Sequence, residues 1–248
     1  MSVIVGSEVP LAVEVEQAVE GVPGWSPIDQ LFALSTLAYA TAHLDGDLVE
    51  VGTWCGRSAL ALAVAARDTH GLVHCIDLFP NRDDWHENRD GSFSFEVTID
   101  GRRHGGCQQQ TVWREPFEHA LLPVYARNPN LLDAMRGNLR RAGLDQFVRA
   151  HRGTAETFAA AAPADLRCRL IFIDGDHSEA AVTRDLAVLT PFLVPGGWVC
   201  FDDAFTVYEG VNRAIERHIL HNPSFDLTRQ LTRKCFAARK AISGAGLR

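Results

Sequence analysis

Residues 48–58 read Leu-Val-Glu-Val-Gly-Thr-Trp-Cys-Gly-Arg-Ser, and this stretch decides the fold. Its apolar start predicts a buried strand, its glycines Gly52 and Gly56 predict a tight turn, and the Ala/Leu-rich run that follows predicts a helix. A strand that enters a helix through such a turn leaves backbone N–H groups pointing at whatever lies above the sheet. The stretch therefore predicts a nucleotide or nucleoside site.

The same turn lacks the spacing that a dinucleotide needs. In the G-x-G-x-x-G pattern a glycine lets the pyrophosphate approach the backbone, and here Trp54 occupies that second position. Glu50, two residues before the first glycine, would place negative charge near an incoming diphosphate. Both features disfavour an NAD-dependent dehydrogenase and favour a cationic nucleoside without phosphates.

The pattern E-x-G-x-x-x-G-x-S in this stretch resembles motif I of the class I S-adenosylmethionine (SAM) methyltransferases. The resemblance implies that SAM is the cofactor. It also implies that the methionine end of SAM is held by Glu50, Gly52, Thr53, Trp54, Gly56 and Ser58. The alternative is a glycine-bearing turn between strand and helix in another doubly wound protein.

Further positions would bind the nucleoside part of the cofactor. Asp77 ends a second predicted strand, 72–77, where a carboxylate can accept hydrogen bonds from both ribose hydroxyls. The alternative for Asp77 is an aspartate that caps a helix. In the methyltransferase pattern the turn after the third strand borders the adenine, which implies that role for Thr154 and Ala155.

Length and composition indicate one α/β domain with an insertion. The 248 residues are 46% hydrophobic and 22% charged, and no apolar stretch is long enough to span a bilayer. We expect no secretory signal and a cytoplasmic location, because no basic residue precedes an apolar run at the N-terminus. The six scattered cysteines are expected to be reduced core residues.

The charge of the chain bears on its partners. A formal net charge of −7 disfavours nucleic acid, because phosphate binding normally needs a basic surface. Basic pairs at 102–103, 140–141 and 233–234 are interpreted as solvated faces. The expected partner is a small hydroxylated molecule rather than nucleic acid or a membrane.

Strands and helices alternate along the chain, which predicts a Rossmann-like fold with a mostly parallel sheet and helices on both faces. Residues 1–27 are interpreted as an N-terminal arm, 28–240 as the methyltransferase domain and 241–248 as a tail. Residues 28–43 predict a helix on one face of the sheet. Residues 225–238 hold two short strands, which the resemblance implies form an antiparallel edge.

An insertion at 79–129 follows the second strand, where a plain doubly wound domain needs only a helix. Residues 93–99 alternate in polarity and are followed by Asp100-Gly101, which predicts a hairpin. Long loops at strand ends usually carry specificity, so one interpretation is a lid or substrate wall. The other is an oligomerisation arm in a homo-oligomer, and the sequence leaves both open.

Two further predicted strands end in groups that carry chemistry. Strand 169–173 runs into Asp-Gly-Asp-His-Ser at 174–178, and strand 198–201, entered through a turn at 195–197, runs into Asp202-Asp203. The carboxyl ends of parallel strands face one crevice, so four carboxylates and an imidazole should converge beside the nucleoside site. Such crowding is costly without a cation, and Mg²⁺ suits oxygen ligands better than Zn²⁺ does.

The run I-D-G-D-H-S-x-x-A-V-x-x-D-L at 173–186 resembles a branch of the SAM methyltransferases. That branch includes macrolide-sugar O-methyltransferases, such as the macrocin and mycinamicin enzymes, and the cephalosporin-hydroxylase-associated methyltransferase. The resemblance implies a metal held by Asp174, Asp202 and Asp203, with Asp174 also beside the cofactor. It implies Asp176 or His177 as the catalytic base. The alternative is that Asp176 caps the following helix and His177 only packs.

Together these features predict a SAM- and metal-dependent O-methyltransferase for a hydroxyl of a small molecule, such as a sugar or ring of a secondary metabolite. A metal on the acceptor oxygens would orient them and lower the pKa of the hydroxyl, and the base would take the proton. One alternative is a catechol-type enzyme, which typically has Asn where Asp203 stands. Another is a SAM-binding scaffold without catalysis. The acceptor itself is not named by any motif.

Overall fold

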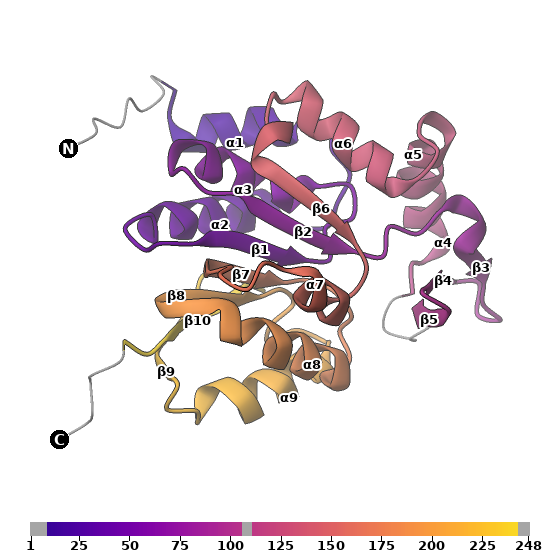
Figure 1. Ribbon diagram of the computed structural model, residues 1–248. Coiled ribbons are helices and arrows are strands. Elements are labelled where there is room, and N and C mark those ends of the chain that lie inside the picture. The colour runs from indigo at the N-terminus through magenta and orange to yellow at the C-terminus, as the bar shows by residue number, and fades with distance from the viewer. Residues whose placement is uncertain (1–8, 106–110, 243–248) are drawn as a thin grey trace.

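A seven-stranded sheet forms the centre of the molecule, with strand order β6-β2-β1-β7-β8-β10-β9 (Figure 1). The computed structural model describes residues 9–105 and 111–242. The strands of this sheet are β1 (Asp47–Val51), β2 (Val73–Asp77), β6 (Val148–Arg152), β7 (Cys168–Ile173), β8 (Leu193–Phe201), β9 (Phe225–Gln230) and β10 (Phe236–Lys240).

Neighbouring strands in the part of the sheet ordered β6-β2-β1-β7-β8 pair in parallel, whereas β10 pairs antiparallel with both β8 and β9. This arrangement confirms the predicted Rossmann-like fold with an antiparallel C-terminal edge. The predicted turn at 195–197 is wrong in one respect, because these residues lie inside β8. They occupy a register shift against β7, which lets a Pro-Gly-Gly run continue the strand.

Alternate side chains of each strand belong to different hydrophobic clusters, one on each face of the sheet. On β1, Leu48 packs in one cluster, whereas Val49 and Val51 pack in the other. The first face is covered by α1 (Leu11–Val19), α2 (Ile28–Ala40), α3 (Arg57–Asp68) and α6 (Leu131–Arg141). The second face is covered by α7 (Ala155–Ala161), α8 (Glu179–Leu189) and α9 (Glu209–Ile215).

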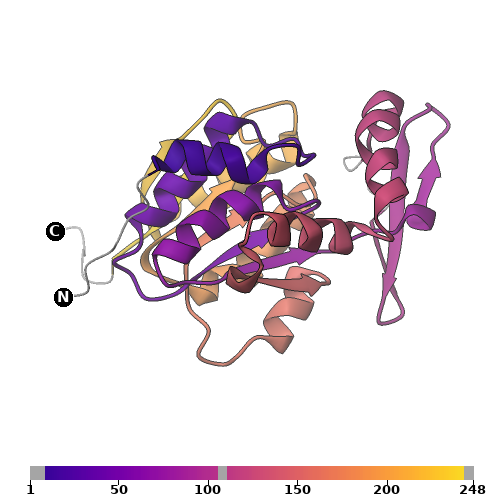
Figure 2. The same ribbon diagram turned by 90° about the horizontal axis from the view of Figure 1, so that it is seen from above.

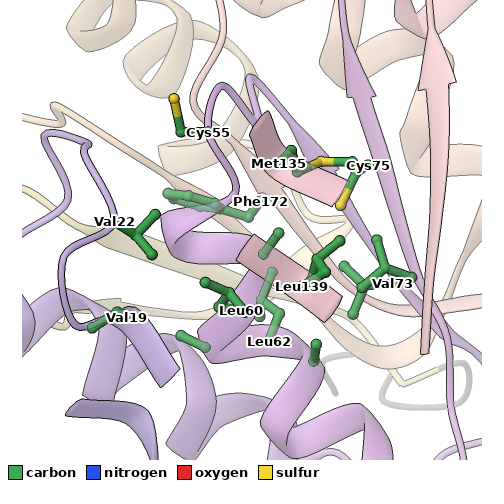
Figure 3. Packing of buried hydrophobic residues seen from close by; sticks show 14 of the residues in the cluster. Val19, Val22, Cys55, Leu60, Leu62, Val73, Cys75, Met135, Leu139 and Phe172 are labelled. Carbon is green, nitrogen blue, oxygen red and sulfur yellow. The ribbon is translucent and has the colours of Figure 1, made fainter. Parts of the chain in front are cut away.

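Helix α3 is the centre of the first cluster and is buried along nearly its whole length. Its alanines let neighbouring helices approach closely, while Leu60 and Leu62 fill the space between α3 and its surroundings (Figure 3). Met135 and Leu139 of α6 belong to the same cluster (Figure 3). Short helical turns complete the main body at η4 (Asp145–Phe147), η5 (Thr190–Phe192) and η6 (Glu216–Leu220).

The N-terminal segment packs on the first face of the sheet. Val15 and Val19 of α1 are buried in the first cluster. The guanidinium of Arg57 donates hydrogen bonds to the carbonyls of Val19 and Val22, each at 3.0 Å, and to that of Ser26 at 3.1 Å. Because Arg57 begins α3, these bonds hold the segment against the turn that follows β1.

The insertion forms a separate layer that projects from the main body (Figure 2). Its hairpin pairs Ile99 with Arg102 across the turn at Asp100 and Gly101, as predicted. Inside this layer Phe93 stacks on Phe117, and Trp85 packs against Phe117 with its ring tilted. Its elements are η1 (Arg82–Asp84), β3 (Trp85–Glu87), β4 (Phe93–Ile99), β5 (Arg102–Gly105), α4 (Arg114–Pro116), η3 (Phe117–Leu121) and α5 (Leu122–Arg127).

Candidate active site

A cavity of about 1350 Å³ opens at the carboxyl ends of the parallel strands. Its floor is the turn after β1 together with Asp77 and the strand ends at 174–177 and 202–203. The insertion supplies another wall through its hairpin and Trp113. A cavity of this size at the edge where parallel strands end is the usual place for a ligand in an open α/β sheet.

The turn after β1 brings the cavity floor close to β7. Gly52 has φ of +90°, and a Cβ there would lie 2.0 Å from the carbonyl oxygen of Asp174. Trp54 also has a positive φ, and its backbone N–H donates to Oδ2 of Asp77 at 2.9 Å. Four of the predicted cofactor residues in this stretch line the cavity: Gly52, Thr53, Trp54 and Ser58.

Two other residues predicted to hold the cofactor lie behind the turn and do not line the cavity. Gly56 is left-handed at the start of α3, and a Cβ there would lie 2.7 Å from Cγ of Met135. Glu50 is fully buried, and this burial raises its pKa to about 7 although contacts with Ser58, Thr53 and Cys75 oppose the shift. The structure thus gives Gly56 a packing role and places Glu50 beneath the site.

Asp77 reaches the cavity from the end of β2. Its Oδ2 accepts from the Trp54 N–H, and its Oδ1 accepts from the Phe79 N–H at 2.6 Å. Burial raises the pKa of Asp77, while the backbone N–H groups around it oppose that shift. Each carboxylate oxygen can accept a second hydrogen bond, so the residue can hold the turn and still receive ribose hydroxyls.

The two residues predicted to border the adenine also line the cavity. Thr154 is the N-cap of α7, and its side chain accepts from the Thr157 N–H at 3.3 Å. Ala155 follows as the first residue of that helix and is buried. Their position is compatible with an adenine neighbour, and that role stays a prediction.

The predicted acids converge, and a lysine lies among them. Nζ of Lys234 donates to Oδ2 of Asp202 at 2.8 Å and lies 3.3 Å from Oδ1 of Asp203. Burial and the neighbouring charge of Asp202 raise the pKa of Asp174 well above its ordinary value. Burial opposes the charge on Lys234, but the carboxylates around it raise its pKa, so it stays an ammonium.

Lys234 corrects one sequence interpretation and is the main residue that sequence reasoning missed. The basic pair at 233–234 was expected to be a solvated face, yet the Lys234 side chain is only 11% exposed. Its position depends on the pairing of β10 with β8, which brings the turn before β10 beside the end of β8. The available signal was the pair of short strands predicted at 225–238, because an antiparallel edge returns the chain to this side of the sheet.

His177 and Asp203 form a pair at the cavity. His177 Nε2 lies 3.1 Å from Asp203 Oδ2, and the imidazole stacks on Tyr208 with ring centroids 4.1 Å apart. Burial would raise the pKa of Asp203, but His177 and Lys234 hold it below its ordinary value. Asp176 differs, because its Oδ1 accepts from the Ser178 N–H at 2.6 Å. It does not cap α8 as the alternative expected, since the N-cap is Ser178, whose side chain accepts from the Ala181 N–H. Both candidate bases line the cavity.

The residues predicted to hold a metal fit that role only in part. Asp174, Asp202 and Asp203 offer the oxygen donors that Mg²⁺ prefers. However, the Lys234 ammonium engages oxygens of both Asp202 and Asp203. Within 9–105 and 111–242, no group of three or more His, Cys, Asp or Glu side chains is arranged to hold a metal. As these side chains stand, they form a site for an ammonium rather than for a divalent ion.

Aromatic residues also line the cavity. Trp54 contacts Trp25 of the N-terminal segment and Trp85 of the insertion, with ring centroids 5.2 and 5.8 Å apart. Trp113 also lines the cavity and is 62% exposed. The N-terminal segment and the insertion are the parts from which acceptor contacts were expected, although no motif pointed to these particular tryptophans.

The family is shown by comparison with known proteins. Residues 49–204, more than half of the chain, match a family described as a methyltransferase domain, and the chain belongs to that family. The matched range contains the turn after β1, Asp77 and both acidic strand ends. This confirms the prediction of a SAM-dependent methyltransferase.

Solved structures show the same fold. The O-methyltransferase NovP has a TM-score of 0.62 at 18% identity, covering 93% of this chain and 98% of its own. The O-methyltransferase TomG of Streptomyces achromogenes, solved with SAM, has a TM-score of 0.55 at 15% identity, covering 96% and 92%. The calicheamicin methyltransferase CalS11 has a TM-score of 0.56 at 16% identity, covering 95% and 88%.

Among the helices described, none is long and apolar enough to cross a membrane.

Proposed function

We propose that this enzyme transfers the methyl group of SAM to a hydroxyl of a small molecule, a sugar or ring of a secondary metabolite. The observation that carries the proposal is the pair formed by His177 and Asp203 beside the cofactor cavity, with 3.1 Å between Nε2 and Oδ2. A histidine oriented by a half-buried carboxylate is a suitable proton acceptor for a hydroxyl. Other residues that line the same cavity would contact the cofactor and the acceptor.

The cofactor fits the residues present. Gly52 lines the cavity in the turn after β1, Asp77 offers carboxylate oxygens to vicinal hydroxyls, and Thr154 and Ala155 would border the nucleoside end. When bound, SAM supplies an electrophilic methyl group on a sulfonium. Alignment of the acceptor with that group would supply much of the rate acceleration, because this displacement is in line.

The proton of the acceptor hydroxyl would pass to His177. As the new oxygen–carbon bond forms and the sulfur–carbon bond breaks, the imidazole takes the proton and becomes a cation. Asp203 would stabilise this cation, because its carboxylate already lies against Nε2. Asp176 is the second candidate base from the sequence, but its Oδ1 is engaged by the Ser178 N–H.

Small-molecule acceptors are favoured by the cavity and by the kinds of proteins that share the fold. TomG is described as involved in tomaymycin synthesis and CalS11 as a calicheamicin methyltransferase. The tryptophans at 25, 54, 85 and 113 suit the apolar faces of a ring or sugar. A catechol-type enzyme is disfavoured by Asp203, which stands where that pattern has Asn.

The Mg²⁺ expected from the sequence has no step in this proposal. Its three expected ligands lie together, but Lys234 engages two of them.

The proposal is tested by binding and by turnover. Calorimetry should show SAM and S-adenosylhomocysteine (SAH) binding, and a panel of glycosylated and phenolic metabolites should give a methylated product by mass spectrometry. His177→Gln should lose turnover and keep SAH binding, whereas His43→Gln, at an exposed position outside this cavity, should keep both. Absence of SAM binding would overturn the proposal. SAH binding with full turnover in His177→Gln would remove His177 as the base.

A further inference from the structure

The ammonium group of Lys234 lies among the carboxylates at the ends of β7 and β8. Lys234 Nζ lies 2.8 Å from Asp202 Oδ2 and 3.3 Å from Asp203 Oδ1, which are hydrogen-bonding and ion-pairing distances. The side chains of Asp202 and Lys234 are 3% and 11% exposed. Buried carboxylates need a partner charge, and here the chain itself provides one.

The backbone of Lys234 is fixed on the sheet. Its carbonyl accepts from the Ala204 N–H at 2.8 Å, next to the acidic pair. Phe236 pairs with Phe201 across β10 and β8, which sets the register of the segment that carries the lysine. The turn before β10 is closed by the Leu231 N–H, which donates to the Cys235 carbonyl at 2.8 Å. The ammonium therefore arrives at the cluster from a rigid hairpin.

A divalent cation would compete with this ammonium for the same oxygens. Mg²⁺ needs several oxygen ligands at about 2.0–2.1 Å in octahedral geometry, and carboxylates are its main protein ligands. Two of the three carboxylates here already face an ammonium, and a second cation beside it would meet strong repulsion. The ammonium lies against Asp202 and Asp203, two of the three carboxylates that the resemblance implies as metal ligands.

We propose that Lys234 is the resident cation of this site and takes the place of a divalent metal. The inference builds on the proposed function, because it names the group that neutralises the acids beside the methyl acceptor. Lys234 holds Asp202 and Asp203 in place, and Asp203 in turn holds His177. The enzyme accordingly needs no added metal for methyl transfer, and removal of the ammonium exposes a cation site.

The test measures binding of Mn²⁺ alone to the purified protein, without SAM or acceptor, by the loss of the free Mn²⁺ signal in electron paramagnetic resonance. Lys234→Met should bind Mn²⁺ at least about tenfold more tightly than the wild type, because the repelling charge is gone. Lys240→Met is the matched control at the far end of β10, since its ammonium donates to the carbonyls of Thr190 and Leu193 instead. It should bind Mn²⁺ as weakly as the wild type.

Two more variants test whether the gain in Mn²⁺ binding comes from the lost positive charge and not from disturbed folding. Lys234→Arg keeps the positive charge and should bind Mn²⁺ as weakly as the wild type. Asp174→Asn combined with Lys234→Met removes a predicted ligand and should lose the gained Mn²⁺ binding. Circular dichroism and thermal unfolding establish that each protein compared is folded.

Three results would overturn the inference. Tight Mn²⁺ binding by the wild type that Asp174→Asn abolishes would overturn it, as would equal Mn²⁺ affinity in Lys234→Arg and Lys234→Met. Turnover of the wild type that EDTA removes and Mg²⁺ restores would overturn it as well. Because Mn²⁺ binding is measured without cofactor, failure of the inference is separate from failure of the proposed function, which SAH calorimetry reports.

Discussion

His177 Nε2 and Asp203 Oδ2 lie 3.1 Å apart at the edge of the cofactor cavity. The same carboxylate faces Lys234 through its other oxygen, so one aspartate joins the proposed base to the proposed cation. Asp203 has a φ of +51°, a left-handed conformation that aspartate tolerates better than most residues. This turn lets Asp203 face His177 while the preceding Asp202 is engaged by Lys234.

The link between Asp203 and His177 predicts the effect of Asp203→Asn. An amide cannot stabilise the imidazolium as a carboxylate does, so turnover should fall by about 10²-fold or more. SAH affinity, measured by calorimetry, should be unchanged. Asp226→Asn is the control, because Asp226 pairs with Arg239 on the edge hairpin and lies outside the cavity. Undiminished turnover in Asp203→Asn would show that the pair is not part of the reaction.

Glu50 predicts a dependence of stability on pH. Burial raises its pKa from about 4.5 to about 7, so the folded state binds the proton more strongly than the unfolded state. The folded protein therefore loses stability as pH rises from about 4.5 to about 7, and this one residue contributes roughly 3 kcal/mol to the loss. Glu50→Gln should remove this contribution.

Urea unfolding at pH 5 and pH 8 measures the effect. The stability of Glu50→Gln relative to the wild type should be greater at pH 8 than at pH 5. Glu16→Gln, at an exposed position on α1, should show the same pH dependence as the wild type. A pH dependence that persists unchanged in Glu50→Gln would mean that the Glu50 carboxylate is stabilised inside the protein in its charged form.

Local patterns predicted the scaffold of the site but not its charge balance. The turn at 48–58 and the acids at 174 and 202–203 follow from short-range spacing, because parallel strands end on one edge. Lys234 could not be placed, since its position depends on antiparallel pairing of β10 with β8 across the intervening α9 and β9. The close approach of Gly56 to Met135 could not be predicted from the sequence either, because it joins the start of α3 to a helix beyond the insertion.

The approach of β1 to β7 predicts the cost of Gly52→Ala. The added Cβ would meet the Asp174 carbonyl at 2.0 Å, and φ of +90° is strained for alanine. The backbone must move, so we expect a loss of several kcal/mol in unfolding free energy and weaker SAH binding. Gly137→Ala on α6 is the control, because a Cβ there has open space, and it should stabilise the protein by about 0.5–1 kcal/mol. A Gly52→Ala protein with unchanged stability would show that this contact relaxes readily.

Trp113 distinguishes the two interpretations of the insertion. Its side chain is 62% exposed at the cavity, so truncation should not lower the melting temperature. If the insertion is a substrate wall, Trp113→Ala should raise the KM for an acceptor found in the metabolite panel by about five- to tenfold, since an aromatic contact of about 1 kcal/mol is lost. The KM for SAM should not change. Leu220→Ala, at an exposed apolar position outside the cavity, should leave both KM values unchanged. An unchanged acceptor KM together with a shift in sedimentation toward smaller species would instead identify the insertion as an oligomerisation arm, because the tryptophan would then contact another copy of the chain rather than the acceptor.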